Sequence, residues 1–342
     1  MSPRLARTAA ALGAAVLLLG LVACPRQPCP GGGGKCVAPR GTPTPTTASP
    51  APSRVPALSV TWRGLPSPPG GARQEVAAAV VDGKIYVAGG LLADGRATAR
   101  VESYDPSTRG WASAPSLPVG LHHPMAVGFR GHLYVLGGIT GRLGGADSAR
   151  VFVLAGGRWN DAPSLRRPRG AGAAVVVNDR IVVAGGIAGA NEVAPVEIFD
   201  GSVWRDGAPI PSPLDHVGAA TDGRYVYVAG GRRNGHHYAT FQRYDPAADT
   251  WQLLRNMPTA RSGLGVAFAK GRVLAIGGEG PRLFPEVEAY DVARAAWSRL
   301  PNMPVPRHGL GTVPIGTSVY TFVGGGKVGL APSDACEVLI LR

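Results

Sequence analysis

The sequence is poor in cysteine, lysine and aromatic residues. Its 342 residues include 4 Cys, and no two of them have the Cys-x-x-Cys spacing of a zinc ribbon or a thioredoxin site. Lysine supplies four of the 35 basic residues. No apolar tract reaches the ~20 residues of a membrane-spanning helix. Glycine and proline are abundant instead, at 50 and 32 residues, and this content excludes a helical solenoid.

The longest apolar tract lies near the N-terminus and has the order of a secretion signal. Arg4 and Arg7 precede the tract Ala9–Val22, and small residues follow it. The sequence Leu21-Val22-Ala23-Cys24 resembles the lipobox of bacterial lipoproteins, in which the Cys thiol receives diacylglycerol and becomes the first mature residue. We therefore predict a signal peptide over 1–23 and lipidation of Cys24. An ordinary signal peptide with an incidental cysteine is the alternative.

Residues 24–57 are predicted to form a flexible tether between the lipid anchor and a folded part. The segment holds four consecutive glycines and a Thr-Pro repeat and almost no large apolar residue, so it cannot bury enough surface to offset its ordering entropy. Cys29 and Cys36 close a short Gly-rich loop, and we expect a disulfide between them in an oxidising compartment. Cys336 is then a lone thiol, expected to be a small buried side chain.

The rest of the chain repeats with a period near 47 residues. The steps between successive Gly-Gly pairs are 48, 48, 45, 47 and 47 residues. The pairs stand at 89–90, 137–138, 185–186, 230–231, 277–278 and 324–325, and the six Trp stand at 62, 111, 159, 204, 251 and 297. All tryptophans of the chain follow the repeat, which predicts a repeated structural unit.

One repeat contains four short apolar runs separated by turn residues. The runs are Val76–Val81, Ile85–Ala88, Val101–Tyr104 and a run around Trp111. Asp-Gly, Gly-Gly and Asp-Pro lie between them. Four antiparallel strands in a meander make one blade of a β-propeller. Separate β-sandwiches would not repeat Trp and Gly-Gly at this period.

These markers, with Tyr before Asp-Pro on the third run and Trp on the fourth, resemble the kelch repeat. The resemblance covers residues 58–342. The second repeat departs most, because Val151-Phe152-Val153 is not followed by Asp-Pro. The resemblance implies that the Tyr and Trp side chains fill the space between blades and that the Gly pairs allow strands to pack closely.

The ends of the repeat region predict how the ring closes. The last repeat supplies three strands, over Gly309–Pro314, Val319–Val323 and Glu337–Leu341, and then the chain ends without a Trp. Leu58–Trp62 has a Trp but no preceding Gly-Gly. We therefore predict an all-β, six-bladed β-propeller of kelch repeats whose closing blade combines N- and C-terminal strands, so that no blade edge is left open.

The formal net charge of +13 raises the question of nucleic acid. Most of this charge is arginine, in a sequence also rich in Ala, Gly and Pro, which is typical of a GC-rich genome. No nucleic-acid motif occurs, and the predicted export argues against such a partner. We expect no nucleic-acid binding.

Alternate connections of an antiparallel meander lie on one face, so one face of the ring holds the longer loops. The segments that enter each first strand carry Arg and His, and in kelch propellers such residues look into the central mouth. We predict an acidic ligand held by eight mouth residues, namely Gln74, His122, Arg169, His216, Arg232, Arg261, Glu279 and Arg307. The alternative for each Arg is that it only braces loop carbonyls.

Metal and acid–base chemistry are the other interpretations of these segments. In an extended chain the adjacent residues His122 and His123 point in opposite directions, as do His236 and His237, so neither pair is expected to chelate a metal. Glu75 and Glu279 lie near Arg and are expected to form ion pairs. We therefore assign no metal, cofactor or catalytic residue.

Three functions suit an exported kelch propeller. The first is a membrane-tethered, extracytoplasmic module that binds a protein or an acidic glycan of the cell envelope. The second is a sugar mutarotase, because the repeats are similar to those of bacterial N-acetylneuraminate epimerases, although no catalytic motif carries over. The third is a copper radical oxidase of the galactose oxidase type, which needs a Cys crosslinked to a Tyr. Cys336 is expected far from the mouth, which argues against the oxidase. Because no catalytic motif supports the mutarotase either, we favour the first function over the others.

Overall fold

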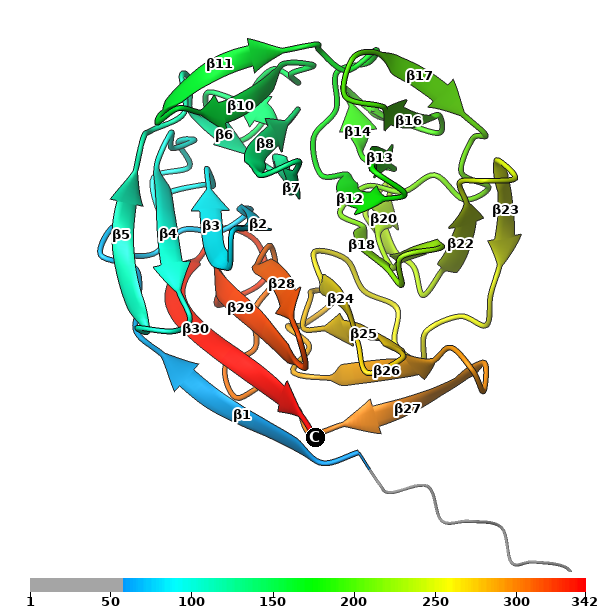
Figure 1. Ribbon diagram of the computed structural model, residues 1–342. Coiled ribbons are helices and arrows are strands. Elements are labelled where there is room, and N and C mark those ends of the chain that lie inside the picture. Colours follow the sequence, from blue (N-terminus) through cyan, green and yellow to red (C-terminus); the bar gives the residue numbers. More distant parts are fainter. Residues whose placement is uncertain (1–57) are drawn as a thin grey trace, which may run out of the picture. The chain divides into compact units, whose positions relative to one another are not determined.

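The computed structural model describes residues 58–342, which form a ring of six four-stranded antiparallel sheets (Figure 1). The first three blades follow one another along the chain. Blade I contains β2 (Ala77–Val81), β3 (Lys84–Ala88), β4 (Val101–Asp105) and β5 (Gly110–Ala114); blade II contains β7 (Met125–Phe129), β8 (His132–Leu136), β10 (Val151–Ala155) and β11 (Arg158–Ala162); blade III contains β12 (Ala173–Val177), β13 (Arg180–Ala184), β16 (Val196–Phe199) and β17 (Trp204–Gly207).

The other three blades continue the same order. Blade IV contains β18 (Gly218–Thr221), β19 (Val226–Ala229), β22 (Phe241–Asp245) and β23 (Thr250–Leu253); blade V contains β24 (Gly265–Ala269), β25 (Arg272–Ile276), β26 (Val287–Asp291) and β27 (Ala296–Leu300); blade VI contains β28 (Gly311–Ile315), β29 (Ser318–Gly325), β30 (Pro332–Leu341) and β1 (Val60–Leu65). Three short pairs lie in the loops: β6 (Leu121–His122) with β9 (Ile139–Thr140), β14 (Ile187–Ala188) with β15 (Asn191–Glu192), and β20 (Arg232–Arg233) with β21 (His236–His237). Among these residues there is no helix long and apolar enough to cross a membrane.

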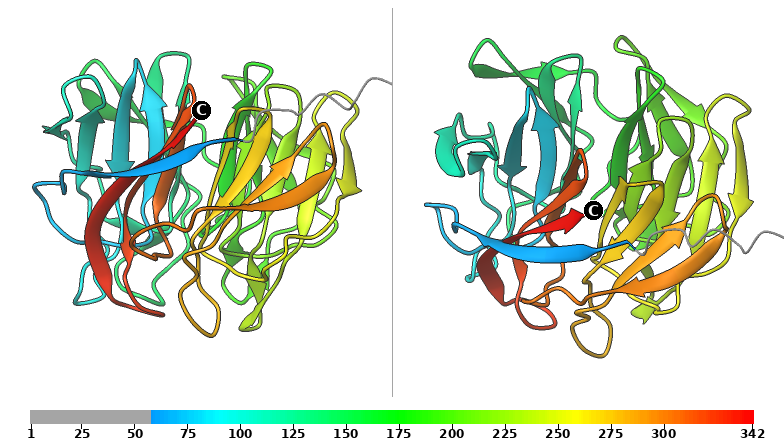
Figure 2. Two further views of the ribbon diagram at one scale, coloured as in Figure 1. Left: turned by 90° about the horizontal axis from the view of Figure 1, so that it is seen from below. Right: turned by 60° about the horizontal axis from the view of Figure 1, so that its bottom comes forward.

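Blade VI closes the ring as the sequence predicts. β1 pairs antiparallel with β30, so that Trp62 lies opposite Leu339, and the order of the sheet is β1-β30-β29-β28. Figure 2 shows the N-terminal strand in blue beside the C-terminal strand in red. The strand begins two residues later and ends three residues later than Leu58–Trp62, because the ladder extends to Leu65 opposite Cys336. The predictions for residues 1–57, including Cys24, Cys29 and Cys36, lie outside the described residues.

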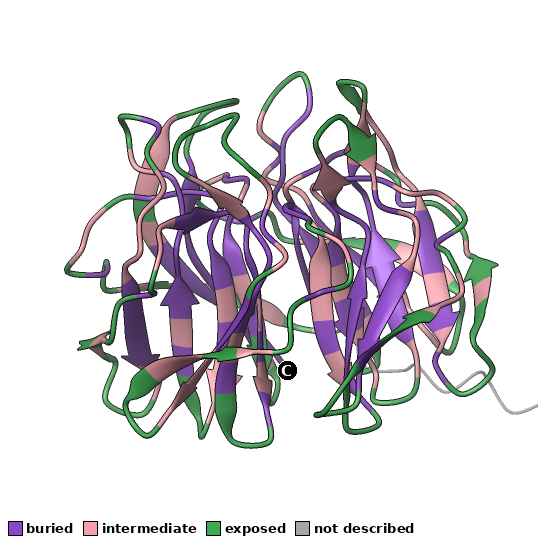
Figure 3. Ribbon diagram, turned by 90° about the horizontal axis from the view of Figure 1, so that it is seen from above, coloured by how far each residue is buried: buried purple, intermediate pink, exposed green. Residues whose placement is uncertain are grey.

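The hydrophobic core is divided among the six spaces between neighbouring blades. Each of the six buried clusters combines apolar side chains of two adjacent blades. Buried segments follow the middle of each blade, and exposed ones follow the loops and outer strands (Figure 3). Every Trp indole also donates a hydrogen bond to a backbone carbonyl of the segment that leaves the preceding blade, as Trp204 does to Pro163 at 2.7 Å. The tryptophans therefore join the blades, as the repeat predicts.

Blade II keeps the fold without the Asp-Pro turn. Ala155 pairs with Arg158 across Gly156 and Gly157, whose φ angles are 59° and 74°. Two consecutive residues with positive φ are what a tight two-residue hairpin needs, and glycine adopts them without a side-chain clash. The departure in sequence is thus a change of turn type.

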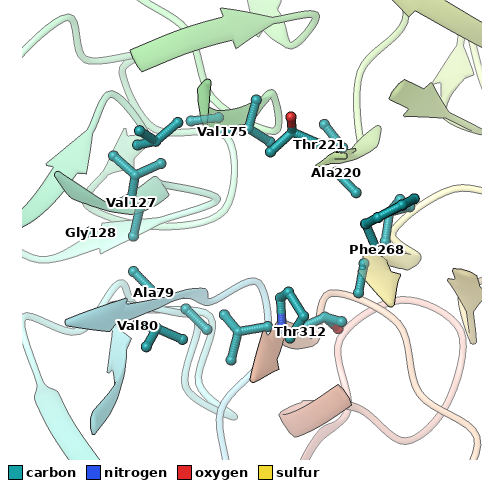
Figure 4. Close-up of a pocket in the computed structure, with 18 residues that line it drawn as sticks. Ala79, Val80, Val127, Gly128, Val175, Ala220, Thr221, Phe268 and Thr312 are labelled. Carbon is teal, nitrogen blue, oxygen red and sulfur yellow. The ribbon is translucent and has the colours of Figure 1, made fainter. Parts of the chain in front are cut away.

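The first strands of the six blades surround an apolar central channel. Its cavity of about 260 Å³ is lined by Ala, Val, Gly, Thr, Phe and Pro residues, and several of their side chains point inward in Figure 4. The tight turns lie at one end of this channel and the longer loops at the other. The titratable side chains near the axis lie at the loop end of the channel, and the candidate site is therefore at that end.

Candidate functional site

A cavity of about 470 Å³ opens at the loop end of the axis. We call it the mouth. Its lining combines carboxylates, imidazoles and one guanidinium with a few apolar side chains. The charged and imidazole lining residues are Glu75, His122, His123, Asp147, Asp215, His216, Arg232, Glu279 and His308. Such a convergence of polar groups from distant parts of the sequence marks this cavity as the candidate binding site.

The residues between the mouth and the first strands follow a three-residue pattern, one triplet for each blade. The triplets are Arg73-Gln74-Glu75, Leu121-His122-His123, Arg169-Gly170-Ala171, Leu214-Asp215-His216, Arg261-Ser262-Gly263 and Arg307-His308-Gly309. The three positions have different environments, and each is described in turn.

The first position of the triplet is structural. Arg73, Arg169, Arg261 and Arg307 have fully buried side chains. Each forms an ion pair at 2.6–3.1 Å with a buried Glu on the third strand of its own blade, respectively Glu102, Glu197, Glu288 and Glu337. The predicted place of Arg169, Arg261 and Arg307 in the mouth is therefore wrong, because their guanidinium groups turn into the blades rather than toward the axis.

The carboxylates of these pairs also hold the segment that enters the blade. Glu102 accepts a hydrogen bond from the backbone N–H of Gly70 at 2.7 Å, and Glu197 accepts one from Arg166 at 2.6 Å. Burial lowers the pKa of Arg73 to about 10, with Glu102 acting against this shift, so the guanidinium stays charged at neutral pH. The arginines brace loops, which is the alternative that the sequence left open.

The third position forms a closed backbone ring around the axis. The N–H of each third-position residue donates to the carbonyl of the preceding blade's third-position residue, at 2.7–3.0 Å in all six cases. We call this set the inner ring: Glu75, His123, Ala171, His216, Gly263 and Gly309. The ring ties all blades together at the floor of the mouth.

All six inner-ring residues have φ between 51° and 60°. Glycine adopts this conformation freely, whereas other L-residues do so at a cost of about 1–2 kcal/mol. Glu75, His123 and His216 nevertheless carry large side chains there. Residues held in such conformations cluster at functional sites.

These three side chains meet one another on the axis. His123 Nε2 lies 3.1 Å from Glu75 Oε2 and 2.9 Å from His216 Nε2. His123 also contacts its neighbour, with the two Nδ1 atoms of His122 and His123 2.5 Å apart. The expectation that these adjacent imidazoles point apart is therefore wrong, because φ of 53° at His123 takes the chain out of the extended conformation.

Second-position side chains surround this group. His308 Nε2 lies 3.3 Å from Glu75 Oε1 and 3.2 Å from Gln74 Nε2. Gln74 in turn accepts a hydrogen bond from the N–H of Ala331 at 2.7 Å and donates to the carbonyl of Gly329 at 2.9 Å. The side chain of Asp215 accepts a short hydrogen bond from His216 Nδ1. Gln74 thus fixes the last loop of the chain over the mouth.

The buried network perturbs the pKa values of its members. Burial lowers the pKa of the His123 imidazole to about 3 despite the nearby Glu75, so the ring is neutral at pH 7. Burial also acts against protonation of His308, but the hydrogen bond and the charge of Glu75 outweigh it and raise the pKa of His308. Burial would raise the pKa of Glu75, yet the hydrogen bond from the His308 imidazole acts against burial, and the pKa of Glu75 lies well below its usual range.

Arg232, from β20, is the single Arg or Lys among the residues that line the mouth in the described chain. Its side chain is 33% exposed and contacts Asp215 at 3.1 Å, Glu279 at 3.5 Å and His216 Nε2 at 3.0 Å. Four carboxylates face the same cavity, those of Glu75, Asp147, Asp215 and Glu279. The mouth is therefore not the positively charged surface that the arginine content suggested.

The structure brings together five of the eight predicted site residues. Gln74, His122, His216, Arg232 and Glu279 line the mouth. Of the triplet residues, the sequence prediction omitted four that also line it, namely Glu75, His123, Asp215 and His308. Aligning the triplets by position would have separated the bracing first position from the other two.

Comparisons with known proteins agree with this architecture. The Kelch motif family matches residues 72–118, 213–258 and 260–304. A protein of similar fold, the solved "Structure of YjhT", superimposes with a TM-score of 0.70 at 14% identity, over 79% of this chain and 95% of that chain. The chain is a kelch-repeat β-propeller.

Curated relatives of this propeller are longer proteins. The Kelch-like protein terF of Aspergillus terreus is 31% identical over 273 residues, which are 72% of this chain and 59% of that protein. Beta-scruin of Limulus polyphemus is 28% identical over 211 residues, which are 56% of this chain and 23% of that protein. The kelch propeller therefore spans less than two thirds of the length of each of these relatives.

Proposed function

We propose that the chain is an exported lipoprotein, anchored through Cys24, whose propeller binds a protein or a glycan of the cell envelope in the mouth. One observation carries the binding function: a cavity of about 470 Å³ whose polar lining is assembled from several blades. Loops displayed by a rigid scaffold are where binding usually resides. The name of the relative Kelch-like protein terF states the repeat and names no ligand.

The charges of the mouth refine the expected ligand. Three arginines that would have attracted an acidic ligand are fully buried in ion pairs. Four carboxylates and one Arg remain at the cavity. Because like charges repel in a partly dry site, a neutral or amino-bearing ligand fits this lining better than an acidic one.

Thermal unfolding of the full chain, purified in detergent, tests this proposal. A panel of neutral, amino-bearing and acidic envelope glycans and peptides is added to the wild type and to Glu279→Gln. We expect a neutral or amino-bearing member to raise the melting temperature and the variant to weaken that effect. Binding that is unchanged in variants of Glu279 and Gln74, but lost on changes in the tight turns at the opposite end, would contradict the mouth as the site.

A sugar mutarotase is the second candidate, and the Glu75–His308 pair favours it. A carboxylate and an imidazole 3.3 Å apart in one cavity can remove the proton of an anomeric hydroxyl and protonate the ring oxygen. Proton NMR of anomer exchange, with N-acetylneuraminate and neutral hexoses, measures this activity directly. The candidate requires faster exchange with the wild type than with Glu75→Gln, and equal rates would exclude it.

A further inference from the structure

The inner ring brings three metal-ligating side chains together at the floor of the mouth. One ligand atom from each of Glu75, His123 and His216 lies within 4.8 Å of the other two. The equivalent positions of the other three blades are Ala171, Gly263 and Gly309, which carry no side chain larger than a methyl group. Two imidazoles and a carboxylate are a common ligand set for divalent transition metals.

The hydrogen bonds behind His216 fix which of its nitrogens carries the proton. Nδ1 of His216 contacts a carboxylate oxygen of Asp215, which can only accept. Nδ1 is therefore the protonated nitrogen, and Nε2 presents a lone pair to the axis. A carboxylate behind a histidine is the arrangement that orients metal-ligating imidazoles.

A second chain of hydrogen bonds determines which ring nitrogen of His123 carries the proton. His122 Nε2 lies 3.2 Å from the carbonyl oxygen of Arg142, which can only accept, so His122 carries its proton on Nε2. Nδ1 of His122 then accepts from Nδ1 of His123 at 2.5 Å. His123 is left with its lone pair on Nε2, which also faces the axis.

Three lone-pair atoms therefore converge with no ring proton of His123 or His216 between them. His123 Nε2 lies 2.9 Å from His216 Nε2 and 3.1 Å from Glu75 Oε2, distances at which acceptors repel one another unless a cation lies between them. Zn–N and Zn–O bonds of about 2.0–2.1 Å at tetrahedral angles place ligand atoms roughly 3.3–3.4 Å apart. Two of the three separations are close to these values, and the ligand atoms of Glu75 and His216 lie within 4.8 Å of each other, so binding of a metal ion requires the side chains to shift.

We propose that the inner ring binds one divalent transition-metal ion of the Zn²⁺ class through Glu75, His123 Nε2 and His216 Nε2. Asp215 and His122 act as positioning residues for the two imidazoles. Three protein ligands leave at least one coordination position open, and it faces the mouth. This site goes beyond the proposed function, because ligand binding by the mouth does not require it.

Arg232 is the group that competes with the ion. One of its terminal nitrogens lies 3.0 Å from His216 Nε2 and donates to the same lone pair. The Arg232 side chain is one-third exposed and contacts Glu279 as well, so it can swing toward that carboxylate when the ion binds. Removal of Arg232 is therefore expected to strengthen metal binding, which a purely structural cluster would not predict.

Titration of the full chain with Zn²⁺ tests the site. The protein is purified in detergent without a polyhistidine tag, in a Cys29→Ser/Cys36→Ser background that removes the two thiols of the tether, and is stripped with a chelator. We expect one Zn²⁺ per chain, measured by calorimetry and by elemental analysis, and a Co²⁺ absorption spectrum of low coordination number. His123→Gln and His216→Gln should each weaken Zn²⁺ binding by more than about 100-fold, and Asp215→Asn by about 10–100-fold.

Matched controls separate metal binding from folding. His237 lies on the same face, with its Nδ1 3.0 Å from Ser262 Oγ, and His237→Gln should leave Zn²⁺ affinity unchanged. Melting temperatures in excess chelator show whether each variant folds, and Arg232→Met should bind Zn²⁺ more tightly than the wild type. Absence of stoichiometric binding by the folded wild type, or equal affinity in His123→Gln and His237→Gln, overturns the proposal.

Discussion

Arg261 and Glu288 form an ion pair in which neither side chain is exposed, with Nη1 of Arg261 3.0 Å from Oε2 of Glu288. Arg261 also donates to the carbonyl of Ala275 at 3.0 Å, and Glu288 accepts from the hydroxyl of Thr259 at 2.6 Å. The pair thus joins the segment that enters blade V to its second and third strands. Its function is to fix this segment, whose Ser262 pairs through the backbone with the mouth residue Glu279.

Arg261→Ala is expected to destabilise the propeller by about 3–5 kcal/mol, because it leaves the Glu288 carboxylate buried without its partner. Denaturant unfolding measures this loss. Blade II supplies a matched control, because Leu121 and Phe152 occupy the equivalent positions there and share one apolar cluster. The double variant Arg261→Leu/Glu288→Phe should recover most of the stability. An Arg261→Ala protein with wild-type stability but weakened ligand binding would restore the original mouth assignment.

The sequence contained the signal for these pairs. Arg occupies the first triplet position in the four blades whose third strand carries Glu, and Leu occupies it in the two blades whose third strand carries Phe152 or Gln242. Such matching indicates contact within a blade. The period of Trp and Gly-Gly likewise predicted the six blades and the closure by β1, because these features depend on local turn and strand chemistry.

The chemistry of the inner ring could not be predicted in this way. It depends on positive φ at Glu75, His123 and His216, which turns side chains toward the axis, whereas sequence reasoning assumes an extended chain before a strand. Contacts such as His123 with His216 also join blades 93 residues apart. Only the closed ring brings these imidazoles together.

The closure of the ring predicts unequal effects of two deletions. Removing residues 25–55 should leave thermal unfolding unchanged, whereas removing 58–65 should abolish cooperative unfolding. The second deletion takes away β1, which exposes the edge of β30 and removes the Trp62 indole that donates to Pro301 at 3.2 Å. Calorimetry of the two proteins checks this prediction, and equal melting temperatures would contradict it.

Cys336 should be chemically inert in the folded protein. Its side chain is 3% exposed, and burial raises the pKa of its thiol to about 11. The thiolate is the reactive form, so very little is present at pH 8. We expect no alkylation of Cys336 by iodoacetamide in the native Cys29→Ser/Cys36→Ser protein and complete alkylation in denaturant, as measured by mass spectrometry. Rapid native labelling would show that β30 opens.

Cys24 is expected to carry the lipid. The reason is the Leu-Val-Ala-Cys sequence directly after the apolar tract. Cys24→Ala should leave the signal peptide uncut or release the protein from the membrane fraction, as seen by fractionation and intact mass. Cys36→Ser is the control, and its product should stay lipidated. An unmodified mature N-terminus at another residue would refute lipidation.

The two glycines of the inner ring provide the last prediction. Gly263 and Gly309 both have positive φ, of 60° and 54°, so replacement by Ala has the same backbone cost of about 1–2 kcal/mol at either position. An added Cβ at Gly263 would meet its nearest atom at 3.3 Å, the backbone nitrogen of Gly309.

At Gly309 the same methyl group would lie 2.4 Å from the Glu75 carboxylate, which must therefore move away from His123 and His308. We expect Gly263→Ala to lower the free energy of unfolding by about 1–2 kcal/mol and to keep the mouth intact. Gly309→Ala should lower it further and should also alter the imidazole NMR signals of His123 and His308. The comparison isolates the position of Glu75, because the backbone strain is common to both variants. Identical stability and identical imidazole spectra in the two variants would show that the Glu75 carboxylate is free to move and is not held by the network.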